Sequence, residues 1–391
     1  MSKQIYFDNA ATTQVRPEVV AKMLPIFTNQ FGNPSALYDI GQEAKAIVDE
    51  SRASIASLIG ADPKEIFFTG SGSEADNWAI RGTAYALKDK GNHIITTAFE
   101  HHAVMNTCAA LEKEGFEVTY VKPDSEGIIS PEDIKNAITD KTILITVMYA
   151  NNEIGTIQPI AEIATIAAEY KIRFHTDAVQ AAGVLPINVG ELGVDMLSIS
   201  AHKFHGPKGI GALYIKKGTK INNLISGGGQ EQGKRAGTEN VAFIAGMAKA
   251  FELAHMQMDE NRLKVAQMRD YLIANVVSKI PRVKVNGHLT KRLPGNANFS
   301  IECIEGESLL LLLNMNGIAA SSGSACASMS LDPSHVLLSI GLPHEIAHGS
   351  IRVTLSDENT YEEIDYFVDK LEEIVKKLRG LSPLWEEKED K

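Results

Sequence analysis

Short apolar runs alternate with helical segments from about Ile66 to Lys217, and no other feature of the sequence restricts the fold as strongly. The runs that predict strands are Glu65–Phe68, His93–Phe99, Glu117–Val121, Thr142–Ala150, Arg173–Asp177, Met196–Ser200 and Gly211–Ile215. Segments such as Ile160–Tyr170, with apolar residues at helical spacing, lie between several of these runs. Strands that alternate with helices require crossover connections, so the pattern predicts an α/β fold with a mostly parallel sheet covered on both faces.

The C-terminal part of the chain has a different pattern. A long, little-interrupted helical pattern from roughly Thr238 to Lys279 is expected to bridge two domains. After it we expect strands near Val283–Val285, Ala297–Ile301 and Ile351–Thr354 and helices near Ser308–Met315 and Tyr361–Arg379. A chain of 391 residues exceeds what one hydrophobic core usually organises. We therefore expect a large domain over residues 16–255 and a smaller α+β domain formed by residues 1–15 and 256–391.

The composition argues against several classes of protein. A formal net charge of −11 disfavours a chain that binds a nucleic-acid backbone, so we expect no direct nucleic-acid partner. The longest apolar run, Leu309–Leu313, is far shorter than the roughly 18 residues of a membrane helix. Three cysteines form neither a disulfide framework nor a metal-ligand pattern, and no export signal is visible. We therefore expect a cytoplasmic protein without a metal site.

The segment Thr69–Asp76, Thr-Gly-Ser-Gly-Ser-Glu-Ala-Asp, lies between a predicted strand and a predicted helix. Gly70 and Gly72 allow the backbone to approach a ligand closely. Ser73 is expected to cap the helix, with Asp76 reaching back as in a capping box. The N–H groups and the dipole at such a helix start favour an anion, most simply a phosphate. The alternative is an ordinary glycine-rich turn with a good cap.

Lys203 stands where the predicted strand Met196–Ser200 ends, in the sequence Ser-Ala-His-Lys-Phe-His-Gly-Pro. A lysine that is desolvated in an active site can lose its proton and form a Schiff base with an aldehyde. Ser200 and His202 could donate to the same phosphate as the glycine-rich segment. The alternative is a surface lysine that enters a turn.

Polar residues also follow other strands of the predicted sheet. Asp177 ends the strand Arg173–Asp177, and a carboxylate at this edge suits a protonated pyridine nitrogen. Helix capping is the alternative role of Asp177. His101 and Asn152 follow two further strands. Ligands of such sheets bind at the carboxyl ends of the strands, so we expect these side chains near Lys203.

Several motifs together resemble one family. The segment around Lys203 resembles the lysine motif of pyridoxal-phosphate enzymes with the class V aminotransferase fold, which is fold type I of the pyridoxal-phosphate-dependent transferases. The motifs similar to those of cysteine desulfurases are Phe7–Thr13, Phe31–Pro34, Asn151–Gly155 and Arg235–Asn240. Ser321–Cys326 resembles the nucleophile loop of the NifS/IscS branch, and the similarity extends to Leu381–Trp385. One departure is Gly72-Ser73, where family members often carry Ala-Thr.

The resemblance implies roles around the cofactor ring. Lys203 would bind pyridoxal 5'-phosphate covalently, and Cys326 would accept the sulfur. His101 would stack on the ring and exchange a proton with the substrate thiol. Asp177 would pair with the ring nitrogen, and Gln180 would contact the phenolic oxygen.

The resemblance also implies which residues bind the phosphate and the substrate. The expected phosphate contacts are Gly72, Ser73, Ser200 and His202, together with Thr238 of the neighbouring subunit. Asn152 would contact both the cofactor and the substrate carboxylate, which Arg352 would also bind, because its planar fork suits a bidentate grip. Cys108 and Cys303 are expected to be core residues.

The implied protein is a homodimeric cysteine desulfurase, which converts L-cysteine to L-alanine and leaves a persulfide on Cys326. The persulfide would pass to an acceptor such as an iron–sulfur scaffold protein, for which the tail Leu381–Lys391 could be a docking segment or simply a frayed terminus. One alternative within the fold is an aminotransferase or a selenocysteine lyase-like enzyme, in which Cys326 has no role. An alternative of another class is a sulfur-relay or scaffold protein that has lost the cofactor.

Overall fold

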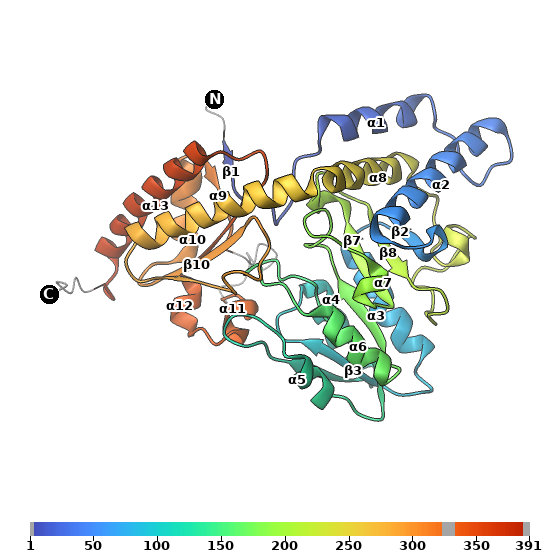
Figure 1. Ribbon diagram of the computed structural model, residues 1–391, viewed down its shortest axis with the longest axis horizontal. Helices are drawn as coiled ribbons and strands as arrows, with labels where there is room; N and C mark the ends of the chain where they lie inside the picture. Colours follow the sequence, from blue (N-terminus) through green and yellow to red (C-terminus); the bar gives the residue numbers. More distant parts are fainter. Residues whose placement is uncertain (1–3, 323–332, 386–391) are drawn as a thin grey trace.

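The computed structural model describes residues 4–322 and 333–385 (Figure 1). Cys326 lies outside the described residues, and so does most of its predicted nucleophile loop. The described residues form a seven-stranded sheet, a three-stranded sheet and a two-stranded sheet, with helices packed against them. Among the described helices, none combines the length and the apolar character that a membrane crossing requires.

The large sheet confirms the predicted fold class. Its strands, in spatial order, are β2 (Ile66–Thr69), β8 (Gly211–Ile215), β7 (Met196–Ser200), β6 (Arg173–Asp177), β5 (Thr142–Thr146), β3 (His93–Thr97) and β4 (Glu117–Val121). Only β8 runs antiparallel to its neighbours, and the other pairs are parallel. The predicted strands that begin at His93 and Thr142 end earlier than expected, at Thr97 and Thr146. The polar residues after them therefore lie on loops beyond the sheet edge.

Both faces of this sheet are covered, because neighbouring strand residues point to opposite sides. Ile94 and Leu144 belong to one apolar cluster, whereas Ile95 and Ile145 belong to the other. The first cluster packs against α3 (Gly72–Ala86) and α4 (His102–Lys113). The second packs against α2 (Asp39–Ile59), α6 (Ile160–Glu169) and α8 (Val241–Met256), and α1 (Pro17–Thr28) lies on α8. Two short helices, α5 (Pro131–Asn136) and α7 (Val189–Leu192), complete this part.

The C-terminal part is built on an antiparallel sheet with the order β12 (Ser350–Thr354), β10 (Asn296–Ile301) and β9 (Val283–Val285). The helices here are α9 (Met258–Lys279), α10 (Gly306–Met315), α11 (His335–Ser339), α12 (His344–His348) and α13 (Tyr361–Leu381). The predicted helix from Thr238 to Lys279 is in fact two helices, since the chain breaks at Gln257 between α8 and α9. Figure 1 shows the two lying nearly end to end.

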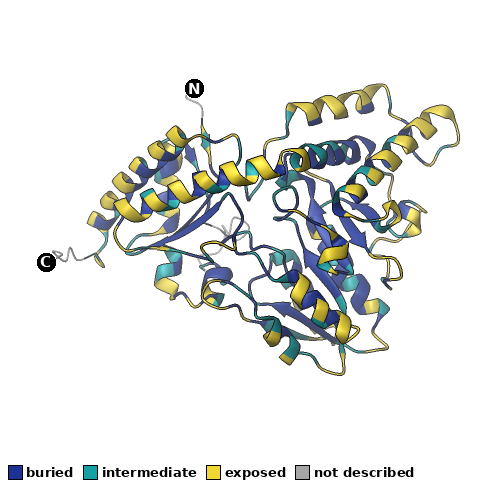
Figure 2. Ribbon diagram, in the orientation of Figure 1, coloured by how far each residue is buried: buried dark blue, intermediate teal, exposed yellow. Residues whose placement is uncertain are grey.

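The N-terminal segment joins the two parts of the chain. Strand β1 (Ile5–Tyr6) pairs in parallel with β11 (Ile318–Ala319), and Phe7 is fully buried in the C-terminal apolar cluster. Six residues later, Thr13 donates its backbone N–H to the carbonyl of His202 in the large part at 2.9 Å. Figure 2 shows that most strands of the seven-stranded and three-stranded sheets are buried, whereas the outer faces of the helices are exposed.

Candidate active site

A single cavity of about 490 Å³ collects almost all of the predicted site residues that the structure describes. The predicted residues that line it are Gly72, Ser73, His101, Asn152, Asp177, Gln180, Ser200, His202, Lys203 and Arg352. Thr238 does not line it and is exposed in the single chain. Cys326 lies outside the described residues. The volume is in the range of pockets that bind small ligands and cofactors.

The start of α3 differs from the prediction in its N-cap, and Asp76 does not complete a capping box there. Ser71, not Ser73, is the N-cap, and its hydroxyl accepts a hydrogen bond from the N–H of Glu74 at 3.1 Å. The carboxylate of Glu74 binds the N–H of Gly70 and the side chain of Arg235, which stabilises the earlier helix start. Ser73 therefore belongs to the first turn, where backbone N–H groups have no intrahelical partner.

Gly72 marks a close approach between this helix start and the chain at the ends of β6 and β7. A Cβ atom on Gly72 would lie 2.7 Å from Cγ2 of Val179 and 3.2 Å from Cβ of Ser200. The absence of a side chain keeps the first turn of α3 against the ends of β6 and β7. The helix N-terminus consequently borders the cavity together with Ser200 and His202, as an anion site requires.

Lys203 lies in a short 3₁₀ turn directly after β7 and points to the N-terminal segment. Its Nζ donates to the backbone carbonyls of Ala10 at 2.5 Å and Ala11 at 2.9 Å. His202 contacts the same segment through Nδ1 and Thr12 Oγ1, at 3.2 Å. Burial, assisted by the charges of Lys203 and Lys208, lowers the pKa of His202 to about 4. His202 is therefore a neutral ring near neutral pH.

Asp177 is the last residue of β6 and is buried. Its Oδ1 accepts a hydrogen bond from the N–H of Val179 at 2.9 Å. Burial raises the pKa of Asp177 to about 6, against the opposing effects of the Val179 contact and the Lys203 charge. A second buried acid, Asp76, lies at the cavity, and burial together with the Asp177 charge raises the pKa of Asp76 well above its usual range.

His101 caps the start of α4, and its Nδ1 accepts a hydrogen bond from the N–H of Ala103 at 3.1 Å. Burial, followed by the charges of Lys203, His102 and His335, lowers the pKa of His101 to about 4. The ring is therefore neutral near neutral pH. Because the Nδ1 lone pair is occupied by Ala103, the ring proton is on Nε2, and His101 is a hydrogen-bond donor at that atom.

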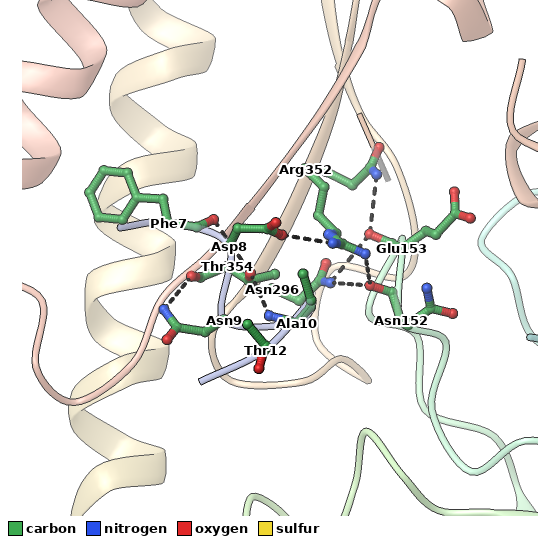
Figure 3. Close-up of polar contacts among 12 residues, drawn as sticks. Phe7, Asp8, Asn9, Ala10, Thr12, Asn152, Glu153, Asn296, Arg352 and Thr354 are labelled. Carbon is green, nitrogen blue, oxygen red and sulfur yellow. Dashed lines mark hydrogen bonds and ion pairs between the residues drawn. The ribbon is translucent and has the colours of Figure 1, made fainter. Parts of the chain in front are cut away.

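Arg352 lies in the middle of β12 with only 2% of its side chain exposed. Its Nη1 donates to the carbonyl oxygen of Asn152 at 3.1 Å, and its Nη2 donates to Oδ1 of Asp8 at 2.8 Å. Figure 3 shows these contacts, with Asp8 on the N-terminal segment and Asn152 on the loop after β5. The C-terminal sheet thus places a buried cation in the cavity of the large part.

Several acidic or imidazole side chains near the cavity were not predicted as site residues from the sequence. Glu100, Glu153 and His335 line the cavity. Asp8 does not line it but binds Arg352, which does. Glu153 accepts a hydrogen bond from Ser334, and His335 Nε2 contacts the carbonyl of Glu100 at 2.9 Å. The sequence held two signals for them, because Asp8 lies within the Phe7–Thr13 motif and Glu153 lies within the Asn151–Gly155 motif.

Two of the cysteines can be compared with their predicted core positions. Cys108 is fully buried in α4, as expected, and burial raises the pKa of its thiol to about 12. Cys303 is only half-buried and follows β10 in a turn with φ of 64°, so the expectation of a core strand residue was wrong. Within residues 4–322 and 333–385, no group of three or more histidine, cysteine or carboxylate side chains could hold a metal ion.

The described residues fit pyridoxal phosphate. A helix N-terminus without a Cβ atom at Gly72 suits the phosphate, and Lys203 suits the aldehyde. Asp177 is a carboxylate whose pKa is raised by burial, and a protonated ring nitrogen beside it would favour its charged form. His101 supplies an aromatic ring at the same cavity.

The fold and the cavity define a fold type I pyridoxal-phosphate enzyme, and sequence comparison agrees. The family model for class-V aminotransferases matches residues 5–367, so the chain belongs to this family. The cysteine desulfurase IscS of Clostridium botulinum (strain Hall) is 59% identical over 389 residues, which cover 99% of this chain and 98% of the relative. The cysteine desulfurase IscS of Methanosarcina thermophila is 56% identical over 383 residues, with 98% and 95% covered.

A solved structure agrees as well. A NifS-like protein superposes with a TM-score of 0.90 at 38% sequence identity, and the match covers 95% of this chain and 99% of that one. The match includes a seven-stranded, mostly parallel sheet and a small C-terminal sheet, as in the described residues.

Proposed function

We propose that the protein is a pyridoxal-phosphate-dependent cysteine desulfurase, which takes sulfur from L-cysteine and releases L-alanine. The observation that carries this proposal is that one cavity brings together Lys203, Asp177 and Arg352, from both parts of the chain. These side chains are a carbonyl-binding amine, a partner for a ring nitrogen and a cation for a carboxylate. The similarity over nearly the full length to two enzymes named cysteine desulfurase supports the substrate.

When bound, pyridoxal phosphate supplies an electron sink that weakens the bonds at Cα and Cβ of the attached amino acid. Gly72, Ser73, Ser200 and His202 would hold its phosphate, and Gln180 would contact its phenolic oxygen. Asp177, as the carboxylate, would keep the ring nitrogen protonated. His101 would stack on the ring and donate from Nε2.

Lys203 and Arg352 would handle the substrate. Arg352, with Asn152 beside it, would bind the substrate carboxylate through the guanidinium fork. Lys203, once displaced by the substrate amine, would take the Cα proton on Nζ. The carbonyls of Ala10 and Ala11 are suited to hold that Nζ as an ammonium group, because both already accept hydrogen bonds from it.

Cys326 is proposed as the sulfur acceptor. Its thiolate would attack the sulfur of the substrate and form an S–S bond, while the Cβ–S bond breaks and its electron pair stays on the carbon fragment. That fragment takes up protons and leaves as L-alanine. The persulfide on Cys326 would then pass to an acceptor protein such as an iron–sulfur scaffold.

The assembly and the domains complete the proposal. We propose a cytoplasmic homodimer in which Thr238 of each subunit reaches the phosphate of the other subunit's site, since Thr238 is exposed and does not line its own cavity. We also propose a large domain over residues 16–255 and a small domain formed by residues 1–15 and 256–391. The burial of Phe7 in the C-terminal apolar cluster supports the assignment of the N-terminus to the small domain.

The test is to incubate the purified protein with pyridoxal phosphate, a reductant and L-cysteine, and to measure L-alanine and sulfide. We expect both products in equal amounts and only with the cofactor. Pyruvate or keto-acid products without sulfide release would indicate an aminotransferase instead. A protein that binds no cofactor would contradict the proposal and favour a non-catalytic scaffold.

A further inference from the structure

The carboxylate of Asp8 and the guanidinium of Arg352 form a largely buried ion pair at 2.8 Å, with side-chain exposures of 18% and 2%. The two residues lie 344 positions apart in the sequence. Removing a partner from a buried charge is costly, because the remaining charge loses both its ion pair and its solvation. Arg352 therefore depends on Asp8 for part of its stability in this position.

Asp8 is held rigidly relative to the strand that carries Arg352. The backbone carbonyl of Phe7 accepts a hydrogen bond from the N–H of Thr354 at 2.7 Å. The side chain of Asn9 donates to the Thr354 carbonyl at 2.8 Å, and the N–H of Ala10 donates to Thr354 Oγ1 at 2.9 Å. Thr354 is two residues beyond Arg352 on β12 (Figure 3). These hydrogen bonds therefore fix the backbone of Asp8 relative to the strand that carries Arg352.

The guanidinium is also held from the large part of the chain. Its Nη1 donates to the carbonyl oxygen of Asn152 at 3.1 Å, and this carbonyl lies on the loop after β5. A guanidinium carries its five N–H donors in one plane, and contacts at two of its nitrogens fix the orientation of that plane. Asp8 and Asn152 thus both help to set how Arg352 faces the cavity.

We propose that Asp8 is a positioning residue, which orients the Arg352 guanidinium for the substrate carboxylate and thereby sets substrate affinity. The inference rests on the proposed function, because it takes Arg352 as the carboxylate-binding residue. Asp8 acts through Arg352 and touches neither the cofactor nor the reacting atoms. Its loss changes KM more than kcat.

The opposite role for Asp8 would be that of an internal competitor, which occupies Arg352 until a substrate displaces it. Two observations favour positioning. Asp8 is not among the described residues that line the cavity, so it reaches Arg352 from outside the substrate space. Its backbone is also fixed to Thr354 on both sides, so it has no freedom to withdraw as substrate binds.

The test compares wild type with Asp8→Ala, Asp8→Asn and the control Asp195→Asn, each as the holoenzyme. Asp195 also pairs with an arginine, Arg173, at 2.9 Å, but at the opposite edge of the large sheet, where β6 begins. The readouts are the Kd of L-alanine from the change in cofactor absorbance, and KM and kcat for L-cysteine. L-Alanine carries the same carboxylate as the substrate and needs no turnover to report on Arg352.

Asp8→Ala should raise the L-alanine Kd and the L-cysteine KM by roughly 10- to 100-fold, as expected for a misplaced binding group, with kcat within about threefold of wild type. Asp8→Asn keeps an oxygen acceptor at this position and should raise both by less than Asp8→Ala. Asp195→Asn should leave Kd and KM unchanged. Should Asp8→Ala not fold, Asp8→Asn alone decides the result.

An unchanged or lowered Kd in both Asp8 variants, with the cofactor bound, would overturn the proposal, and a lowered Kd would indicate the competitor role. A 10- to 100-fold loss in kcat of the Asp8 variants without a change in Kd would also overturn the proposal. A wild type that binds L-alanine but does not form it from L-cysteine would contradict the proposed function and leave the Kd comparison valid.

Discussion

The ammonium group of Lys203 lowers the pKa of Asp177, but burial raises it by more, and the resulting pKa is about 6. The two residues end neighbouring strands, since Asp177 is paired with Ser198 across β6 and β7, and Lys203 follows directly after β7. Asp177 therefore carries a full charge only above about pH 6 in the protein without cofactor. This relationship links the proposed partner of the ring nitrogen to the proposed cofactor lysine.

The first prediction is a pH dependence of cofactor affinity. Below pH 6 Asp177 becomes neutral and no longer favours a protonated ring nitrogen, so the affinity for pyridoxal phosphate should fall by roughly tenfold per pH unit. Asp177→Asn should bind more weakly at pH 7.5 and lose this dependence. Equilibrium binding followed by absorbance between pH 5 and 8 measures both. Parallel pH profiles in the two proteins would refute the role of Asp177.

The second prediction concerns the close approach at Gly72. Gly72→Ala places a Cβ atom 2.7 Å from Cγ2 of Val179, which must push the first turn of α3 from its place. We expect about tenfold weaker binding of pyridoxal phosphate. Val179→Ala removes that methyl group, so the double variant should regain most of the affinity, whereas Val179→Ala alone should bind like wild type. The double variant binding as weakly as Gly72→Ala would show that contact with Val179 is not the cause.

The third prediction concerns stability. Burial raises the pKa of Glu100 to about 8, whereas in the unfolded chain the group ionises near its ordinary value of 4.5. A raised folded pKa means that the native state holds the proton longer, so stability falls as pH rises from about 4.5 to about 8. Glu100→Gln removes this loss and should be more stable than wild type at pH 9, by on the order of 5 kcal/mol.

Urea unfolding of the cofactor-free protein at pH 5 and pH 9 measures this difference. The exposed Glu169→Gln is the matched control and should follow wild type at both pH values. If Glu100→Gln loses stability with pH as steeply as wild type does, Glu100 is not the group that titrates.

The fourth prediction tests the proposed homodimer, in which each site would receive Thr238 from the other subunit. Thr238→Asp would place a carboxylate beside the partner's phosphate, so this variant and Lys203→Ala should both be inactive alone. In a mixed dimer, the site with an intact Lys203 receives an intact Thr238, and random exchange should restore roughly a quarter of wild-type activity. A mixture without activity, or a light-scattering mass equal to one chain, would contradict the shared site.

Many residues of the cavity could be predicted because they follow directly after strands that the sequence indicates. Asp177, Lys203 and Ser200 could be placed at one sheet edge because they follow directly from the alternation of apolar runs. The same reasoning correctly predicted that His101 and Asn152 lie at the cavity, although β3 ends four residues before His101 and β5 ends six residues before Asn152. Loops after parallel strands share the edge whatever their length.

Contacts between distant segments were not predictable. Asp8 reaches Arg352 only because β1 and Phe7 pack in the C-terminal part, which no local pattern indicates. The cap of α3 was expected at Ser73, whereas the contact of Glu74 with Arg235, 161 residues away, favours Ser71. Tertiary contacts therefore decided the details that helical and strand periodicity left open.

The decisive measurement is L-alanine release from L-cysteine, with pyridoxal phosphate and a reductant, by wild type, Lys203→Ala and Cys326→Ser. We predict release by wild type alone, with Cys326→Ser still showing the absorbance of bound cofactor and Lys203→Ala losing it. Release that persists in Cys326→Ser would mean that sulfur leaves without a protein acceptor. Release that persists at the wild-type rate in Lys203→Ala would contradict the assignment of the cofactor lysine and, with it, the proposed function of the cavity.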